Sequence, residues 1–213
     1  HEIRNPLGTM RMKVENAMAA PVDLREARVA GALEAVLSQT ARLETLVSSL
    51  LALTQPFRAE REAVDLREWL EERRNAHAEA AQKNGVRITV KVDAALAASA
   101  KGAALFDPVQ MARVFDNLLL NALAHTGESG QIELGARRTR RGALLLWVAD
   151  DGSGIPLDLR DTLFEPFATH RAGGTGLGLA LVREIVQGHG GRAYLADSAQ
   201  GTRMEMELPW PAS

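Results

Sequence analysis

Ala143-Leu144-Leu145-Leu146-Trp147-Val148-Ala149 is an almost wholly apolar run, and Asp150-Asp151-Gly152-Ser153-Gly154-Ile155-Pro156 follows it directly. A short apolar run that ends at a turn predicts a strand, and the lack of alternating polar residues predicts a central one. A carboxylate at a strand end, beside glycines that let backbone approach closely, can accept a hydrogen bond from the amino group of a base. Aspartate-glycine pairs also mark ordinary turns, so a turn without a ligand is the alternative for this stretch alone.

Strands and helices are predicted on both sides of that run. Val86–Val92 alternates apolar with polar residues, as a half-buried strand does. Asp65 and Asp107 are expected to cap helices, and Gly85 to end the first of them. Helices gathered around a mixed, largely antiparallel sheet give an α+β sandwich. The other expected strands are 103–106, 132–136, 192–196 and 203–208, and the expected helices are 66–84, 108–124 and 177–187.

Residues 1–55 predict a separate helical hairpin. Apolar residues from Ile3 to Met18 recur at steps of three and four, as on one face of a helix. Pro21 interrupts this helix, Asp23 is expected to cap the next, and a second apolar seam runs from Leu33 to Leu51. Two helices cannot cover such seams alone, so dimerisation into a four-helix bundle is expected. A plain coiled-coil dimeriser is the alternative.

Length and composition narrow the class of protein. The chain of 213 residues, 46% of them hydrophobic, can form two domains, which are expected at 1–55 and 56–213. A formal net charge of −2 gives no global basic field for nucleic acid. The absence of cysteine excludes disulfides and thiolate metal sites. No apolar run approaches the roughly 18 to 20 residues that span a bilayer. The abrupt start within an expected helix predicts a fragment of a longer protein.

The chain opens with His1-Glu2-Ile3-Arg4-Asn5-Pro6, in which a histidine precedes a carboxylate on an expected helix. An imidazole beside a hydrogen-bond acceptor suits phosphorus chemistry. Proline inside a helix removes a hydrogen bond to the residue four positions back, so Pro6 predicts a loosened turn beside His1. The alternative is that Pro6 lies in the first turn of a helix that begins near Asn5, where proline is tolerated.

Three further patches hold residue types that folding alone explains poorly. Asn117 and Asn121 lie four apart on an expected helix, where asparagine is disfavoured and where an amide oxygen suits Mg²⁺. Phe164-Glu165-Pro166-Phe167 is typical of a loop anchored at one end, and 173–179 is a glycine-rich turn whose amides can hold phosphate. A structural cap, a hydrophobic anchor and a chance glycine pattern are the respective alternatives. The arrival of all four patches within about sixty residues favours a nucleotide site.

In this order the motifs resemble those of the sensor histidine kinases of two-component signalling. Residues 1–7 are similar to the phosphoacceptor box, and 117–122, 150–154, 164–167 and 174–178 are similar to the N, G1, F and G2 boxes of the catalytic ATP-binding domain. The resemblance implies a dimeric helical hairpin followed by an α/β sandwich of the Bergerat (GHKL) type. That catalytic fold is shared with Hsp90 and MutL-type ATPases, which lack the hairpin.

The resemblance also implies roles in phosphoryl transfer. His1 would be the nucleophile, Glu2 would manage its proton, and Asn5 would position water for dephosphorylating a partner. The partners implied are a second copy of the chain, through the hairpin, and the receiver domain of a response regulator, but not nucleic acid. The location implied is the bacterial cytoplasm, as part of a longer sensor with any membrane anchor outside this chain.

ATP and Mg²⁺ are the ligands that the resemblance implies. Asn121 and Asn117 would lie at the metal, and Asp150 at the adenine amino group. The remaining nucleotide contacts are expected from His125, Gly152, Gly154, Arg171, Gly174, Thr175, Gly176, Leu177 and Gly178.

Two alternative functions stay open. Ala124 stands where the family usually has a lysine, and Arg171 or His125 is expected to supply part of that charge. This departure favours a pseudokinase or scaffold that binds nucleotide without transferring it. A GHKL clamp-type ATPase is the other alternative, although the leading hairpin and the short segment between Gly154 and Gly174 argue against it.

Overall fold

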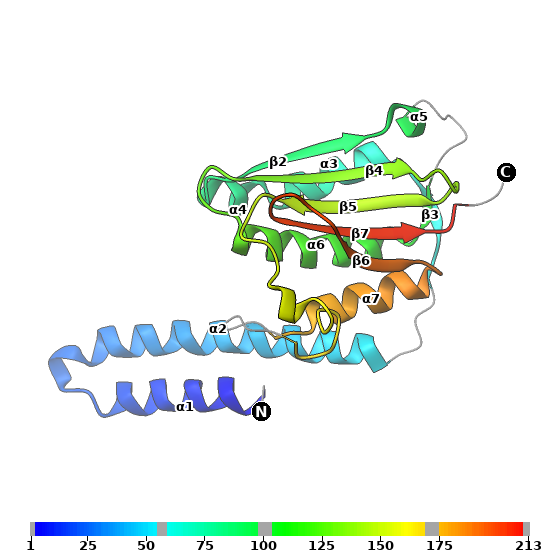
Figure 1. Cartoon of the computed structure of the whole chain (residues 1–213). Coiled ribbons are helices and arrows are strands. Elements are labelled where there is room, and N and C mark those ends of the chain that lie inside the picture. Colours follow the sequence, from blue (N-terminus) through cyan, green and yellow to red (C-terminus); the bar gives the residue numbers. More distant parts are fainter. Residues whose placement is uncertain (1–2, 55–58, 98–103, 169–174, 211–213) are drawn as a thin grey trace. The chain divides into compact units, whose positions relative to one another are not determined.

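The computed structural model describes residues 3–54, 59–97, 104–168 and 175–210 (Figure 1). These residues form two compact units. The first contains helices α1 and α2 with residues 175–177, and the second contains the remaining described residues. The first unit is helical and the second is α+β.

A helical hairpin makes up most of the first unit. α1 spans Arg4–Met18 and α2 spans Val22–Thr54, with Pro21 in the turn between them. Pro6 lies in the first turn of α1, where a missing N–H leaves no gap in the helix. The predicted loosened turn beside His1 falls on residues 1–2, which lie outside the described residues. Asp23 lies inside the first turn of α2, so the prediction that it precedes this helix is wrong: the N–H of Leu24 already donates to Pro21 O at 3.0 Å.

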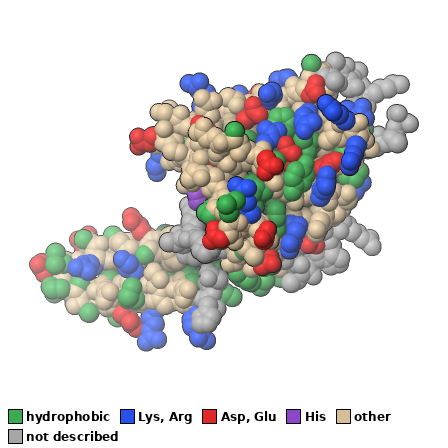
Figure 2. All heavy atoms as spheres, viewed as in Figure 1, with side chains coloured by type: hydrophobic (Ala, Val, Ile, Leu, Met, Phe, Trp, Pro, Cys, Tyr) green, Lys and Arg blue, Asp and Glu red, His purple; other side chains and the backbone are tan. Residues whose placement is uncertain are grey.

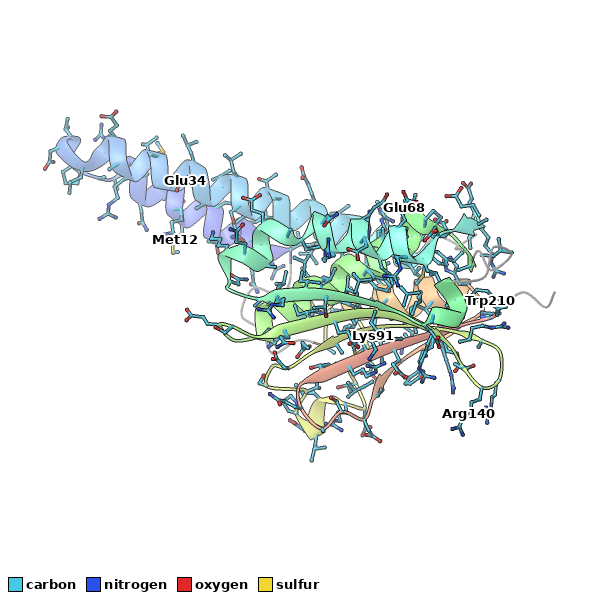
Figure 3. All side chains as sticks on the ribbon, turned by 90° about the horizontal axis from the view of Figure 1, so that it is seen from above. Met12, Glu34, Glu68, Lys91, Arg140 and Trp210 are labelled. Carbon is cyan, nitrogen blue, oxygen red and sulfur yellow. The ribbon has the colours of Figure 1, made fainter. Side chains whose placement is uncertain are left out.

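The apolar seams of the hairpin are only partly covered. Ala17, Ala20, Ala32 and Leu46 are buried. Hydrophobic side chains lie among the charged ones on the hairpin in Figure 2, and Met12 projects outward from α1 in Figure 3. Large exposed apolar patches commonly mark interaction surfaces. The exposed large apolar residues are Ile3, Leu7, Met12, Val14, Met18, Val22, Leu24, Val29, Leu33, Leu37, Val47, Leu50 and Leu51.

A five-stranded sheet forms the frame of the second unit, with strand order β2-β4-β5-β7-β6. β2 (Arg87–Val92) pairs in parallel with β4 (Gln131–Arg138). β5 (Leu144–Asp150), β7 (Thr202–Leu208) and β6 (Arg192–Ala196) are joined by antiparallel pairing. The predicted mixed, largely antiparallel sheet is confirmed, and the apolar strand β5 is its middle strand.

Three helices cover one face of this sheet: α3 (Leu66–Ala76), α6 (Pro108–His125) and α7 (Gly178–Gly188) (Figure 1). Asp65 and Asp107 cap α3 and α6 as predicted, and each accepts hydrogen bonds from two backbone N–H groups. Two packed layers therefore enclose one core. Its buried residues include Leu70, Phe106, Met111, Phe115, Leu119, Ile132, Leu134, Leu146, Val182 and Met206.

The helix predicted over 66–84 is in fact two helices. Gly85, with φ +66°, follows them as predicted. The helical conformation is interrupted at His77, between α3 and α4 (Ala78–Lys83). His77 has φ −107° and ψ 6°, and its Nε2 lies 2.9 Å from Oδ1 of Asp116 on α6. A tertiary contact accompanies the break, and no glycine or proline marks it in the sequence.

Two short elements were not predicted. β1 (Glu62–Val64) pairs antiparallel with β3 (Ala104–Phe106), the strand predicted at 103–106, and α5 (Ala94–Ala97) occupies a segment rich in alanine. The three residues of β1 are too few to show a period in the sequence. Alanine favours a helix by propensity, but the segment is too short for this propensity to predict one.

The outer face of the sheet is stabilised around Trp147. A Cβ on Gly135 would overlap the indole ring of Trp147, so the ring lies directly over the glycine of the neighbouring strand. Its Nε1 donates to Oε1 of Glu133 at 2.8 Å, and the guanidinium of Arg203 lies 4.5 Å from the ring centroid. Arg140 marks the β4–β5 turn in Figure 3, so Asp150 ends β5 at the opposite end of this stable frame.

Candidate functional site

The two asparagines of α6 lie on its half-buried side. Nδ2 of Asn117 donates to the carbonyl oxygen of Arg113 at 2.7 Å, one helical turn back. This bond directs Oδ1 of Asn117 toward the start of α7, where a Cβ on Gly178 would lie 2.7 Å from it. The glycine at that position therefore lets α7 begin beside an amide oxygen of α6.

Asp150 holds the loop that follows β5. Its Oδ1 accepts the backbone N–H of Gly152 at 3.0 Å and that of Thr202 at 3.2 Å. Burial raises the pKa of Asp150, and the hydrogen bonds from Gly152 and Thr202 only partly oppose this. Oδ1 thus already accepts hydrogen bonds from the protein backbone, and Oδ2 can accept a hydrogen bond from a ligand.

Glycines bring three segments together around that carboxylate. A Cβ on Gly152 would overlap the carbonyl oxygen of His125, at the end of α6. A Cβ on Gly201 would overlap the carbonyl oxygen of Asp150, and Gly201 also has φ +66°. Gly154 has φ +73° and would place a Cβ 3.2 Å from Gly201 O. The loop after β5, the end of α6 and the turn before β7 therefore meet backbone to backbone.

Gly201 and Thr202 were not among the predicted site residues. The antiparallel register of β5 with β7 places Thr202 opposite Asp150, so the last strand contributes to the site although it is some fifty positions away in the sequence. The only signal in the sequence was a glycine and a threonine before an alternating strand. That pattern is common at strand starts.

The remaining predicted residues are placed less completely. His125 ends α6 and is exposed, as is Ala124 beside it. Thr175 Oγ1 accepts the N–H of Leu177 at 3.4 Å, and Gly176 has φ +65°. Arg171 and Gly174 lie outside the described residues.

The predicted phosphoacceptor segment is described from Ile3 onward, and His1 and Glu2 lie outside the described residues. Asn5 is exposed in the first turn of α1, and its carbonyl oxygen accepts a hydrogen bond from the hydroxyl of Thr9 at 3.1 Å.

The donor set fits a nucleotide with magnesium. Gly178 opens α7 beside Oδ1 of Asn117, and the beginning of a helix suits phosphate, while the carboxylate of Asp150 suits an amino group. The described residues hold no group of three or more histidine, aspartate or glutamate side chains that could bind a metal by themselves. Amide oxygens of Asn117 and Asn121 fit Mg²⁺, which takes few protein ligands and completes its shell with water and phosphate.

Residues 106–212 match the family model described as histidine kinase-, DNA gyrase B-, and HSP90-like ATPase, and the chain belongs to this family. Its curated relatives include the alginate biosynthesis sensor protein KinB of Pseudomonas aeruginosa, 34% identical over 98% of this chain. The sensor histidine kinase ZraS of Klebsiella oxytoca is 34% identical over 94%. The predicted resemblance to sensor histidine kinases is confirmed. The chain spans only 35% and 42% of the length of these two relatives.

Solved histidine kinases share the fold. ThkA, in a complex with the response regulator protein TrrA, gives a TM-score of 0.75 at 25% identity, over 99% of this chain and 59% of that one. Full-length ShkA in complex with AMPPNP gives 0.73 at 25% identity, over 100% of this chain and 45% of that one. AdeS of Acinetobacter baumannii, at 19% identity and a TM-score of 0.72 over 100% of this chain and 98% of that one, shows likeness of fold alone.

Proposed function

We propose that this chain is the kinase portion of a sensor histidine kinase, which moves the γ-phosphoryl group of ATP to His1 and then to an aspartate of a response regulator. The observation that carries the proposal is the meeting of Asn117 with Gly178, and of Asp150 with Gly152, in one unit of a chain that opens on a helical hairpin. The names of the relatives and the complex of ThkA with a response regulator protein support it. Dephosphorylation of the regulator, with Asn5 positioning water, belongs to the same proposal.

We assign residues 1–55 to dimerisation and histidine phosphotransfer, and 56–213 to catalytic ATP binding. The exposed apolar residues of α1 and α2 support a homodimeric four-helix bundle, because a second hairpin would remove them from water. Among the described residues, no helix has the length and apolar character needed to cross a bilayer. We propose that the activity lies in the cytoplasm, because it would draw on ATP and on a response regulator there.

The residues of the site divide the binding of ATP between them. Oδ2 of Asp150 would accept from the adenine amino group, while Thr202 keeps the carboxylate oriented through Oδ1. Backbone amides of 174–178 would hold the phosphates, with Arg171 and His125 supplying charge where Ala124 lacks it. Mg²⁺, held by amide oxygens of Asn121 and Asn117, would neutralise phosphate charge during the transfer.

The chemistry at His1 is an in-line displacement. A neutral imidazole nitrogen would bond to the γ-phosphorus as the bond from that phosphorus to the bridging oxygen breaks and ADP leaves. The proton on the other ring nitrogen would pass to the carboxylate of Glu2, which orients the ring before the attack. The phosphohistidine would then give its phosphoryl group to the carboxylate of the regulator.

The test is phosphorylation of the 213-residue chain with γ-labelled ATP and Mg²⁺. We expect an acid-labile, alkali-stable phosphoprotein from the wild type and none from His1→Ala, with the affinity of both for AMPPNP unchanged. If His1→Ala also loses AMPPNP binding, the histidine is structural and its assignment as nucleophile is wrong.

One observation favours a second function. Ala124 is exposed at the position where a lysine is expected, so a nucleotide-binding pseudokinase is the alternative. It predicts AMPPNP binding with no phosphoprotein under any condition. Steady ATP turnover without an acid-labile phosphoprotein would instead indicate a clamp-type ATPase.

A further inference from the structure

His189 is a buried histidine that directly follows α7, at the far end of that helix from the glycine turn. Its Nδ1 lies 2.7 Å from the carbonyl oxygen of Ile185, and its Nε2 lies 3.0 Å from the backbone N–H of Asp107. A carbonyl oxygen only accepts, so Nδ1 carries the proton, and an N–H only donates, so Nε2 presents a lone pair. The two contacts together require a neutral imidazole in one tautomer.

This imidazole joins the two helices of the nucleotide site. Asp107 is the N-cap of α6, and its Oδ1 accepts the N–H groups of Val109 and Gln110 at 3.1 and 3.0 Å. His189 therefore connects the end of α7 to the beginning of α6. Since Asn117 of α6 also meets Gly178 at the beginning of α7, the antiparallel pair is in contact at two places along its length.

The segment that leads into β1 forms hydrogen bonds with the same two residues, Asp107 and His189. The backbone N–H of Glu60 donates to Oδ2 of Asp107 at 3.1 Å. Nη2 of Arg61 donates to the carbonyl oxygen of His189 at 2.8 Å. In the sequence, residues 55–58 connect α2 to this segment. Glu60 and Arg61 thus link the segment that follows the hairpin in the sequence to the contact of His189 with Asp107. We call this contact the joint between α6 and α7.

We propose that His189 is a positioning residue for ATP. Through the joint that it makes, the Glu60–Arg61 segment sets the placement of α6 against α7. Protonation of Nε2 of His189 opens that joint. The inference rests on the proposed function only in taking ATP as the ligand. An added proton would place an N–H of the imidazolium against the N–H of Asp107, and two donors cannot bond.

Charged groups that face His189 include Asp107, from the junction of β3 and α6, and Arg61, from the segment before β1. Burial is the largest influence and lowers the pKa of His189, with Arg61 acting in the same direction and Asp107 against it. The protein therefore favours the neutral imidazole, and the joint opens when falling pH adds the second proton. For a base with a lowered pKa, the stabilisation is present above its unfolded pKa and is lost as pH falls toward the folded one.

The test compares AMPPNP affinity, with Mg²⁺, of the 213-residue chain and its variants by calorimetry. Glutamine offers one donor and one acceptor but does not titrate, so His189→Gln should keep wild-type affinity at about pH 7.5 to within about threefold. His189→Ala should lose about tenfold or more, and Arg61→Ala several-fold, because a missing partner leaves buried groups unpaired. Arg67→Ala, at an exposed arginine of α3, is the matched control and should leave the affinity unchanged.

The pH profile separates positioning from simple packing. As the pH is lowered below the ordinary pKa of histidine, the wild type should lose several-fold more affinity than His189→Gln, because glutamine at this position cannot gain a proton. Equal losses in the two proteins would overturn the proposal, and so would wild-type affinity in Arg61→Ala and His189→Ala. If His189→Ala does not fold, the Arg61→Ala affinity and the pH comparison decide the matter. Failure of the wild type itself to bind AMPPNP would instead contradict the proposed function.

Discussion

Asp150 shows how one carboxylate can hold a loop and still face a ligand. Oδ1 accepts two backbone N–H groups, and burial raises the pKa of the side chain. For an acid whose folded pKa is raised, the favourable contribution is present below the unfolded pKa and is lost as pH rises through the folded one. At neutral pH the ionised carboxylate therefore costs the free protein some stability, and a ligand donor on Oδ2 offsets that cost.

The substitution Asp150→Asn tests this balance between stability and ligand binding. The amide oxygen can still accept from Gly152 and Thr202, so the unfolding temperature without nucleotide should be unchanged or higher. Affinity for AMPPNP should fall by about 10- to 100-fold, because a hydrogen bond to a charged acceptor contributes about 1.5 to 3 kcal/mol. Calorimetric titration measures the affinity, with Asp158→Asn, at an exposed aspartate of the same unit, as control. Near-normal affinity would remove Asp150 from the site.

Gly201 is the residue whose replacement tests the backbone contact most directly. Gly201→Ala forces a Cβ against the carbonyl oxygen of Asp150 at φ +66°, so it should lower the free energy of unfolding by more than about 1 kcal/mol and weaken AMPPNP binding. Gly127→Ala is the matched control, because a Cβ there meets nothing within 4 Å. Urea denaturation measures the free energy of unfolding of the two variants, and calorimetric titration measures their affinity for AMPPNP. If the two variants have equal stability, the close approach at Gly201 does not constrain the fold.

At the scale of the element, α3 begins because Asp65 caps it. Its Oδ1 accepts the N–H groups of Arg67 and Glu68 at 2.9 and 3.1 Å. Asp65→Ala should lower the free energy of unfolding by about 1 kcal/mol while leaving AMPPNP affinity unchanged, since α3 carries none of the proposed ligand contacts. The urea midpoint reports the loss, with exposed Asp161→Ala as the comparison. A midpoint like that of the wild type would show that packing alone sets the start of α3.

Other elements show where local signals are overruled. β5 could be predicted because a strand buried on both faces needs apolar residues throughout. The break at His77 could not, because it accompanies a contact with Asp116 across to α6. β1, which was not predicted, has three residues and takes its ladder hydrogen bonds from β3, a strand that was predicted. Short elements exist only where a distant partner completes them.

At the scale of the whole molecule, the exposed hairpin seam predicts the oligomeric state. We expect the wild type to be a dimer in sedimentation experiments and Leu33→Glu/Leu37→Glu to be a monomer, because charges would be buried in the seam. AMPPNP affinity should be unchanged, since the second unit is untouched. Leu157→Glu, at an exposed leucine of the second unit, is the control and should remain dimeric. A monomeric wild type, or a dimeric double variant, would contradict the four-helix bundle.

The sequence by itself determined the elements whose cause is local or periodic: the long helices, the caps at Asp65 and Asp107, the apolar central strand, and the glycines and asparagines of the nucleotide motifs. It also determined the family, since the order of those motifs along the chain needs no coordinates. Only the tertiary structure decided what meets what. Thr202 joins Asp150 through strand register, Gly178 receives Asn117, and His189 joins α6 to α7 and to the segment that enters from the hairpin. Such contacts depend on the spatial coincidence of groups far apart in the chain, and no local pattern of residue types records it.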